Sequence, residues 1–307
     1  MRRHLSMLVT GTAAVVIGAS VAASSAQVNA GPGDRPMHLL SVDPNAVAQG
    51  PAVVPMPDAP PDLTIGLDVR ARQAASDAAN LGADISFTML DRKTGQTISG
   101  GDGSPFPIAS VSKLFIADDL LLQVAKGQRQ LTPEERQSFD VMLRSSDDNA
   151  AEVFWGESGG SAVISRVAAR YGLGSTSAPY DGNWWNTMST TSDLVHYYDM
   201  LLDGAGGLPP DQVAAILSDL STSTPTGLDG YPQRFGIPDG LYAEPVAVKQ
   251  GWMCCWNGGN WLHMTTGIIG PDRRFVIAMA SLQPVDDATA RNTLTQAIKT
   301  MFPGGRV

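Results

Sequence analysis

The sequence predicts an α/β protein of the α+β type, with one five-stranded antiparallel sheet flanked by terminal helices and a separate all-helical lobe. Three observations carry this prediction. Residues 84–100 alternate between apolar and polar positions like a β-hairpin, three β-rich runs occupy residues 242–282, and the segments between them have helical periodicity. Because strands at both ends of the chain enclose the helices, we expect the strands to join in a single sheet.

Each element has its own signal. The first helix is expected from about Leu67 to Asn80, and the hairpin should pair residues 84–90 with 96–100 around a turn at 91–95. The segment Ser110–Ala125 is apolar at most positions, which is typical of a buried helix. Thr132 and Pro133 predict the start of the next helix, as a cap and a first-turn proline. Further helices are expected at 148–155, 162–171, 192–202, 210–219 and 286–301, and strands at 242–249, 261–269 and 275–282.

The first 26 residues have the composition of a signal peptide. Two arginines precede an apolar run from Leu8 to about Ala23, and small residues offer a cleavage site after Ala26. The run is shorter than the ~20 residues of a spanning helix, which favours cleavage over an uncleaved anchor, and no nearby cysteine could carry a lipid. Residues 27–62 contain eight prolines and predict a disordered linker. The folded domain is therefore expected at residues 63–307.

Composition narrows the class of partner. The formal charge is −9, and it becomes −11 when residues 1–26 are removed with their two arginines, which argues against nucleic acid and anionic membranes as partners. The four histidines show no metal-ligand spacing, so no metal is expected. No organic cofactor is implied either. Cys254 and Cys255 are the two cysteines, and in an exported chain they could be free thiols or a vicinal disulfide.

Three short motifs follow one another along the chain: Ser110-Val-Ser-Lys113, Ser146-Asp-Asp-Asn149 and Lys249-Gln-Gly251. An S-x-x-K at a helix start places a serine hydroxyl and a lysine amine one turn apart on the same face. That is the arrangement of a nucleophile beside its base. Lys113 stands among apolar residues, where an unpaired ammonium would be costly, so it should be paired or functional. The simpler alternative is that Ser110 only caps the following helix.

In this order, the motifs resemble those of the penicillin-recognising serine hydrolases, the family of class A β-lactamases and D,D-peptidases. The resemblance runs from about Leu63 to about Phe302. It implies a serine β-lactamase-like fold with a cleft between the sheet and the helical lobe. It also implies that Ser110 is the nucleophile, Lys113 its base, and Ser146 a second hydroxyl that relays a proton to the leaving group.

The same resemblance implies how substrate would be held. The backbone N–H groups of Ser110 and Trp252 would form the oxyanion hole. Lys249 would supply positive charge for a substrate carboxylate, and the glycine after it would let the backbone approach the ligand. The implied substrate-binding residues are Asp148, Asn149, Lys249, Gln250 and Gly251.

The chain departs from the family pattern at three places. Asp148 stands where the family usually has an asparagine, unless the register shifts by one and Asn149 takes that role. Gln250 replaces a small hydroxyl residue. The loop at 177–186 lacks the glutamate of class A β-lactamases, and Asp181 is its only acid. Efficient hydrolysis of a β-lactam acyl-enzyme is therefore not expected.

These features predict a secreted, extracytoplasmic serine hydrolase that forms an acyl-enzyme with small-molecule or peptide substrates. Cell-wall peptides of peptidoglycan, or other amides and esters, fit that class, and the enzyme should bind penicillin but be a poor β-lactamase. The alternative is a non-catalytic, wall-associated binding or scaffold protein with a degenerate site. Five tryptophans should border the cleft and could either stack on wall sugars or only pack there: Trp184, Trp185, Trp252, Trp256 and Trp261.

Overall fold

The fold is known from a computed structural model that describes residues 64–307, so the expected signal peptide and linker lie outside the described residues. One five-stranded sheet has the order β2-β1-β7-β6-β5 with all neighbours antiparallel. Its strands are β1 (Asp84–Asp91), β2 (Gln96–Gly100), β5 (Val246–Trp256), β6 (Asn260–Ile269) and β7 (Phe275–Gln283). The predicted sheet is confirmed, and β5 forms one of its edges.

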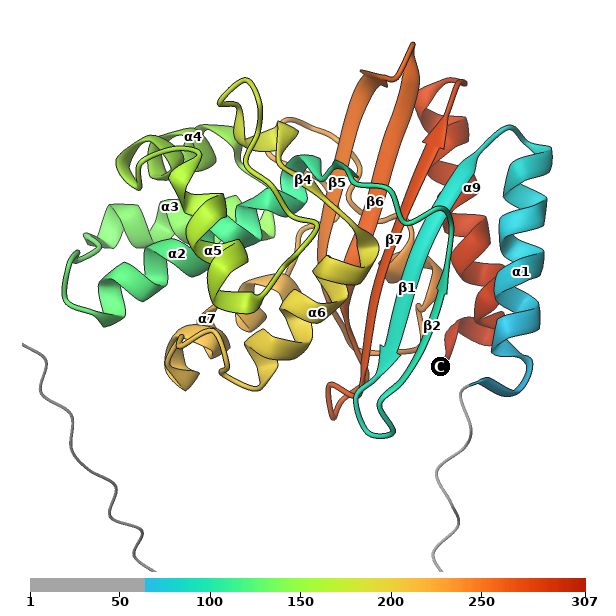
Figure 1. Cartoon of the computed structure of the whole chain (residues 1–307), viewed down its shortest axis with the longest axis horizontal. Coiled ribbons are helices and arrows are strands. Elements are labelled where there is room, and N and C mark those ends of the chain that lie inside the picture. The colour runs from blue at the N-terminus through green and yellow to red at the C-terminus, as the bar shows by residue number, and fades with distance from the viewer. Residues whose placement is uncertain (1–63) are drawn as a thin grey trace, which may run out of the picture. The chain divides into compact units, whose positions relative to one another are not determined.

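The terminal helices cover one face of this sheet. Helices α1 (Thr64–Asn80) and α9 (Asp287–Met301) lie against each other and against the sheet (Figure 1). The buried face of α1 consists of Leu67 and three alanines at helical spacing, Ala71, Ala74 and Ala78. Leu294 and Ile298 of α9 belong to the same core cluster, which confirms the predicted flanking helices.

The helical lobe lies on the other side of the sheet. It contains α2 (Lys113–Ala125), α3 (Pro133–Arg144), α4 (Asp148–Glu157), α5 (Ala162–Tyr171) and α7 (Pro210–Ser221), while α6 (Thr191–Leu202) packs on β1 and β7 (Figure 1). Helix α3 begins with the expected cap, since the Thr132 side chain accepts from the backbone N–H of Glu135. Between residues 64 and 307, no helix combines the length and apolar character that a membrane crossing needs.

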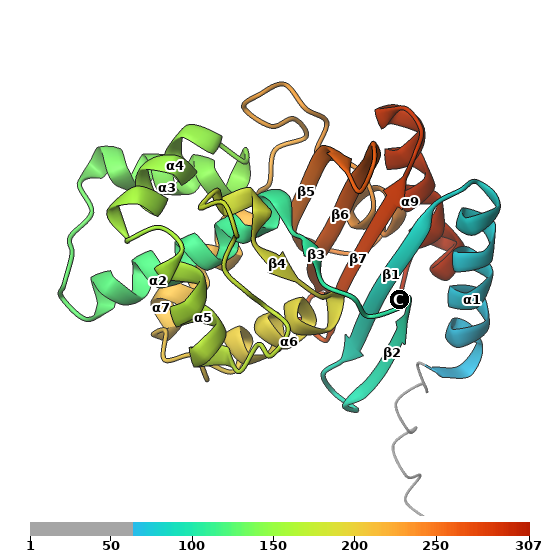
Figure 2. The same ribbon diagram turned by 45° about the horizontal axis from the view of Figure 1, so that its top comes forward.

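Short elements connect the lobe to the sheet. Strands β3 (Phe106–Pro107) and β4 (Met188–Ser189) pair as a small second sheet beside the large one (Figure 2). The remaining elements are the 3₁₀ helices η1 (Ala109–Ser112), η2 (Trp184–Asn186) and η3 (Pro303–Gly305), and the short helix α8 (Ile237–Gly240). None of these was predicted from the sequence, because each is only one turn or one bridge long.

Most elements begin or end within one to three residues of the predicted bounds, and two of the differences affect the candidate site. The helix expected from Ser110 begins with η1, and its α-helical part starts only at Lys113. The strand expected at 242–249 is β5, which starts at Val246 and continues to Trp256. The reason is a turn at Asn257-Gly258-Gly259, where all three residues have positive φ. That turn allows β5 and β6 to pair as far as Trp256 and Asn260, across a bulge after Met253.

Candidate active site

Ser110 lies where the helical lobe meets the edge of the sheet. It is the second residue of η1 and is 7% exposed. Strand β5 comes close to this segment at Gly251, where an added Cβ would lie 2.9 Å from the carbonyl oxygen of Ile108. Any other residue at 251 would therefore push the strand away from the serine. The glycine of the third motif is explained here by contact between two segments of the protein.

Lys113 is a fully buried lysine, and its ammonium group is surrounded by oxygen atoms. Its Nζ donates to Ser110 Oγ at 2.9 Å, to the carbonyl oxygen of Ser146 at 2.8 Å, to Ser146 Oγ at 3.1 Å and to Asp148 Oδ1 at 2.5 Å. The expectation that this lysine is paired is confirmed. The structure brings the proposed nucleophile and the proposed base into direct hydrogen-bonding contact.

Ser146 joins the two lysines of the site. Its hydroxyl accepts from Lys113 Nζ at 3.1 Å and from Lys249 Nζ at 2.9 Å. The backbone of Ser146 is left-handed, with φ of 56°, which is unusual for a residue other than glycine. This conformation lies between the end of α3 and the start of α4, and the hydroxyl it carries is in contact with both amines.

The environment lowers the pKa of both lysines. Burial lowers the pKa of Lys113, although the carboxylate of Asp148 works in the opposite direction. Burial, together with the neighbouring Lys113 cation, lowers the pKa of Lys249 well below its usual value. A lysine that loses its proton more readily is a better general base near neutral pH.

The edge strand β5 presents backbone groups to the same site. The Lys249 carbonyl accepts from Thr266 Oγ1 on the neighbouring strand β6 at 2.8 Å. Because backbone groups alternate in direction along a strand, those of Gln250 and Trp252 are directed to the free edge of the sheet. Ser110 near the start of η1 also has an N–H without a partner in its helix. This geometry is compatible with the expected oxyanion donors, Ser110 and Trp252.

The second and third motifs are only partly in the expected arrangement. Asp148 contacts Lys113, as the unshifted register predicts, and the exposed Asn149 does not enter this network. Gln250 is buried, and its Nε2 donates to the carbonyl oxygens of Gln233 at 3.2 Å and Phe235 at 2.5 Å. The side chain of Gln250 is thus bonded to a loop of the protein, and its substrate-binding role stays a prediction.

The loop at 177–186 places a tryptophan over the base. The Trp184 ring centroid lies 4.6 Å from Lys113 Nζ, and its Nε1 donates to Glu152 Oε2 at 3.1 Å. Asp181, the only acid of the loop, accepts from Asn183 and from Asn186 Nδ2. Its carboxylate therefore stabilises the conformation of its own loop. Sequence reasoning assigned Trp184 to the cleft border but did not find its contact with Lys113.

A segment that the sequence analysis did not single out closes another side of the site. The backbone N–H of Leu228 donates to the carbonyl oxygen of Ser145 at 2.8 Å, next to Ser146. Asp229 follows in the same turn, and its carboxylate acts on both Lys113 and Lys249. The ring of Tyr231 stacks on Trp252, with centroids 4.4 Å apart. The closely spaced glycines 227 and 230 were the available signal for a turn here.

Cys254 and Cys255 form a disulfide near the tip of the β5–β6 hairpin, which decides between the two states left open by the sequence. The pair is exposed, two residues beyond Trp252. Within residues 64–307, no group of three histidine, cysteine or acidic residues is arranged to hold a metal ion.

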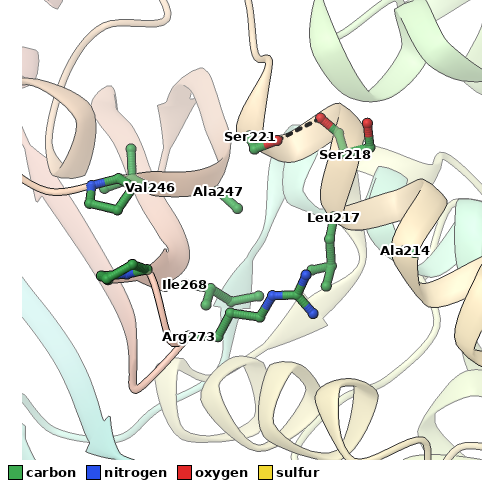
Figure 3. A pocket seen from close by; sticks show the side chains of 11 residues that line it. Ala214, Leu217, Ser218, Ser221, Val246, Ala247, Ile268 and Arg273 are labelled. Atoms are coloured by element: carbon green, nitrogen blue, oxygen red, sulfur yellow. Dashed lines mark hydrogen bonds between the residues drawn. The ribbon is translucent and has the colours of Figure 1, made fainter.

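A separate cavity of about 300 Å³ lies between α7 and the beginning of β5 (Figure 3). Leu217, Val246 and Ile268 give it an apolar lining, and the Arg273 side chain reaches toward it (Figure 3). None of the predicted site residues lines this cavity.

Comparison with known proteins identifies relatives by sequence. No protein-family model matches the chain. Proteins named "Putative lipoprotein LppW" from Mycobacterium bovis and Mycobacterium tuberculosis are 61% identical over 252 residues. The matched region covers 82% of this chain and 80% of each relative.

Comparison of structures identifies the fold. A β-lactamase from Chitinophaga pinensis matches 76% of this chain and 98% of its own at 18% identity, with a TM-score of 0.60. The TLA-3 extended-spectrum β-lactamase matches 77% of this chain and 98% of its own at 13% identity, with a TM-score of 0.63. A mutant of PBP-A, solved as an acyl-enzyme complex with penicillin G, matches 78% of this chain and 96% of its own at 17% identity, with a TM-score of 0.64. At these identities the likeness shows the fold alone.

Proposed function

The chain belongs to the LppW family and has the fold of the penicillin-recognising serine hydrolases, and from this premise we propose that it is an exported serine hydrolase that works through an acyl-enzyme. One observation carries the proposal. Lys113 Nζ lies 2.9 Å from Ser110 Oγ in a buried site, and Ser146 Oγ links that lysine to Lys249. Burial that lowers the pKa of Lys113 supports its role as base.

The proposed reaction begins with proton transfer from Ser110 Oγ to neutral Lys113 Nζ while the oxygen attacks a carbonyl carbon. The N–H groups of Ser110 and Trp252 stabilise the oxyanion that forms. Ser146 then donates its proton to the leaving amine or alkoxide and is reprotonated by the Lys113 ammonium. The carbon–nitrogen or carbon–oxygen bond breaks, and the acyl group stays on Ser110 until water or an amine accepts it.

Export is part of the proposal. It rests on the arginines and apolar run at residues 2–23, and on the word lipoprotein in the names of the relatives. Both cysteines of this chain are paired with each other at 254–255, so the proposal does not include lipid attachment through either of them. The proposed substrates are amides or esters of small molecules or peptides outside the membrane, including peptidoglycan.

The test is covalent labelling of Ser110. The full exported domain should gain the mass of one penicillin or one fluorophosphonate, and Ser110→Ala should gain none. Ser112→Ala is the matched control, because Ser112 Oγ donates to the carbonyl oxygen of Ala109 and lies outside the network of Lys113. It should label like the wild type. Absence of any adduct on the folded wild-type protein would overturn the proposal.

A second candidate function is favoured by one observation. The Trp184 ring covers Lys113 Nζ, and Asp148 adds an ion pair to the same nitrogen. Such a site could bind a ligand without reacting. A non-catalytic wall-binding protein would show saturable binding of a penicillin or a wall peptide to both the wild type and Ser110→Ala, with no mass adduct on either.

A further inference from the structure

The exposed charges around the proposed nucleophile are negative. Both lysines of the site are buried, Lys113 at 0% and Lys249 at 1% exposure. In contrast, the side chain of Asp148 is 65% exposed although one of its oxygens bonds Lys113. Asp229, which also acts on both lysines, is exposed. A substrate that approaches Ser110 from the solvent therefore meets carboxylates before it meets an ammonium group.

The groups that the family resemblance assigns to a substrate carboxylate are already engaged within the protein. Lys249 Nζ donates to Ser146 Oγ at 2.9 Å and to the carbonyl oxygen of Gln250 at 3.2 Å. The Nε2 of Gln250 donates to two carbonyl oxygens of the loop at 233–235. A substrate carboxylate would thus have to approach two aspartates, and within residues 64–307 the side-chain donors of this motif have acceptors except for one N–H of the Lys249 ammonium group.

Asp148 limits the kind of hydrogen bond that the site can make with a substrate. An asparagine at this position would present both a donor and an acceptor, whereas a carboxylate only accepts. Oδ1 is used by Lys113, and no hydrogen bond within residues 64–307 engages Oδ2. When Lys113 is neutral and ready to act as a base, the charge of Asp148 is no longer balanced by it. A protonated amine on the substrate would satisfy both the free oxygen and the charge.

We propose that Asp148 is a specificity-determining residue, and that the cleft selects acyl donors with an ammonium group close to the scissile carbonyl. This inference rests on the proposed acyl-enzyme function and names its substrate class. The ammonium belongs to the part of the substrate that stays on Ser110, because Asp148 lies beside Lys113 on the nucleophile's side of the cleft. Amides and esters of peptides with a free amine have this chemistry.

Three penicillins provide a matched set of probes. Benzylpenicillin has a neutral side chain, ampicillin adds an ammonium group at the same carbon, and carbenicillin adds a carboxylate there. Second-order acylation rates of the exported domain should be measured by intact mass, at a pH at which the ampicillin amine is protonated. We expect ampicillin to react fastest and carbenicillin slowest, with about a tenfold or larger ratio, which corresponds to about 1.4 kcal/mol. Added salt should reduce that ratio.

Two variants separate this inference from the function on which it rests. Asp148→Asn should still be acylated and should bring the three rates to within about twofold. Asp211→Asn removes the same charge at an exposed position of α7 and should keep the wild-type ratio. Equal rates for the three probes in the wild type, or a preference for carbenicillin, would overturn the inference and leave the proposed function standing. Absence of any adduct with all three would overturn both.

Discussion

The two walls of the proposed site differ in what they keep of an acyl-transfer site. On one wall, Ser110, Lys113 and Ser146 form a continuous hydrogen-bonded chain. On the other, the loop at 177–186 has a buried tryptophan against Lys113 and a single acid that is bonded to its own loop. The residues proposed to form an acyl-enzyme therefore contact one another, whereas the loop at 177–186, where the family resemblance places the deacylating glutamate, has no glutamate.

The largest effect is expected when the proposed base is removed from the wall that contains Ser110, Lys113 and Ser146. Lys113→Ala should lower the rate of acylation by every probe about 10²–10⁴-fold, which is the usual contribution of a general base. Lys249→Ala should instead slow carboxylate-bearing probes far more than neutral esters, because Lys249 acts through charge. Acylation rates with one charged and one neutral probe on both variants provide the measurement. Normal acylation of a folded Lys113→Ala protein would show that Lys113 is not the base.

The second test acts on the opposite wall. The wild type should release its acyl group slowly, with nitrocefin turnover below about 1 per second, the lower end of typical enzymes. Trp184→Ala should admit water beside Lys113 and raise the deacylation rate about tenfold, although removal of a buried tryptophan should cost about 3–5 kcal/mol of folding free energy. Trp184→Phe is the control that keeps a ring in place. Fast nitrocefin turnover by the wild type would contradict the division of the two walls.

A third test uses pH to examine the link between Asp148 and the base. Acylation should accelerate as pH rises through the pKa of Lys113, because only the neutral amine accepts the serine proton. The Asp148 carboxylate raises that pKa against the effect of burial. Asp148→Asn should therefore move the rising limb of the pH profile to lower pH and increase the rate several-fold at a pH on the wild-type limb. A shift to higher pH would exclude Lys113 as the titrating base.

The smallest effect is expected at Asp181. Asp181→Asn should change deacylation by less than about threefold, since the carboxylate is exposed and accepts hydrogen bonds from Asn183 and Asn186 in its own loop. Burst and steady-state phases with nitrocefin separate this step from acylation. A loss of tenfold or more in the steady-state phase would identify Asp181 as a base that the geometry does not suggest.

Much of this structure could be predicted from the sequence where the signal is local. Helix α5 was predicted with its observed bounds, because its apolar spacing ends at Gly172, which has the left-handed conformation of a helix terminus. The contact between Ser110 and Lys113 could be predicted because both residues lie on one turn. The five-stranded sheet was also correct, since its strands fall at the two ends of the chain.

Contacts between distant segments could not be predicted in the same way. The hydrogen bonds of the Gln250 side chain to the loop at 233–235 and the contact of Trp184 with Lys113 depend on how separate segments pack. No spacing in the sequence encodes either contact. The end of β5 was misplaced although Asn257-Gly258-Gly259 is a hairpin signal, because the Trp and Cys residues before it do not alternate. The charge of the cleft likewise depends on which lysines are buried, which composition alone does not reveal.

The left-handed backbone at Ala109 and Ser146 bears on whether this site could be moved to another protein. These two residues adjoin or carry the hydroxyls that Lys113 contacts, and their φ values are 46° and 56°. A short peptide with the same sequence would leave this conformation, which costs about 1–3 kcal/mol for each residue other than glycine. The surrounding domain therefore imposes the geometry on both segments. Grafting Ser110-Val-Ser-Lys113 onto a different helix would transfer the sequence of the motif but not the position of the Ser110 hydroxyl group.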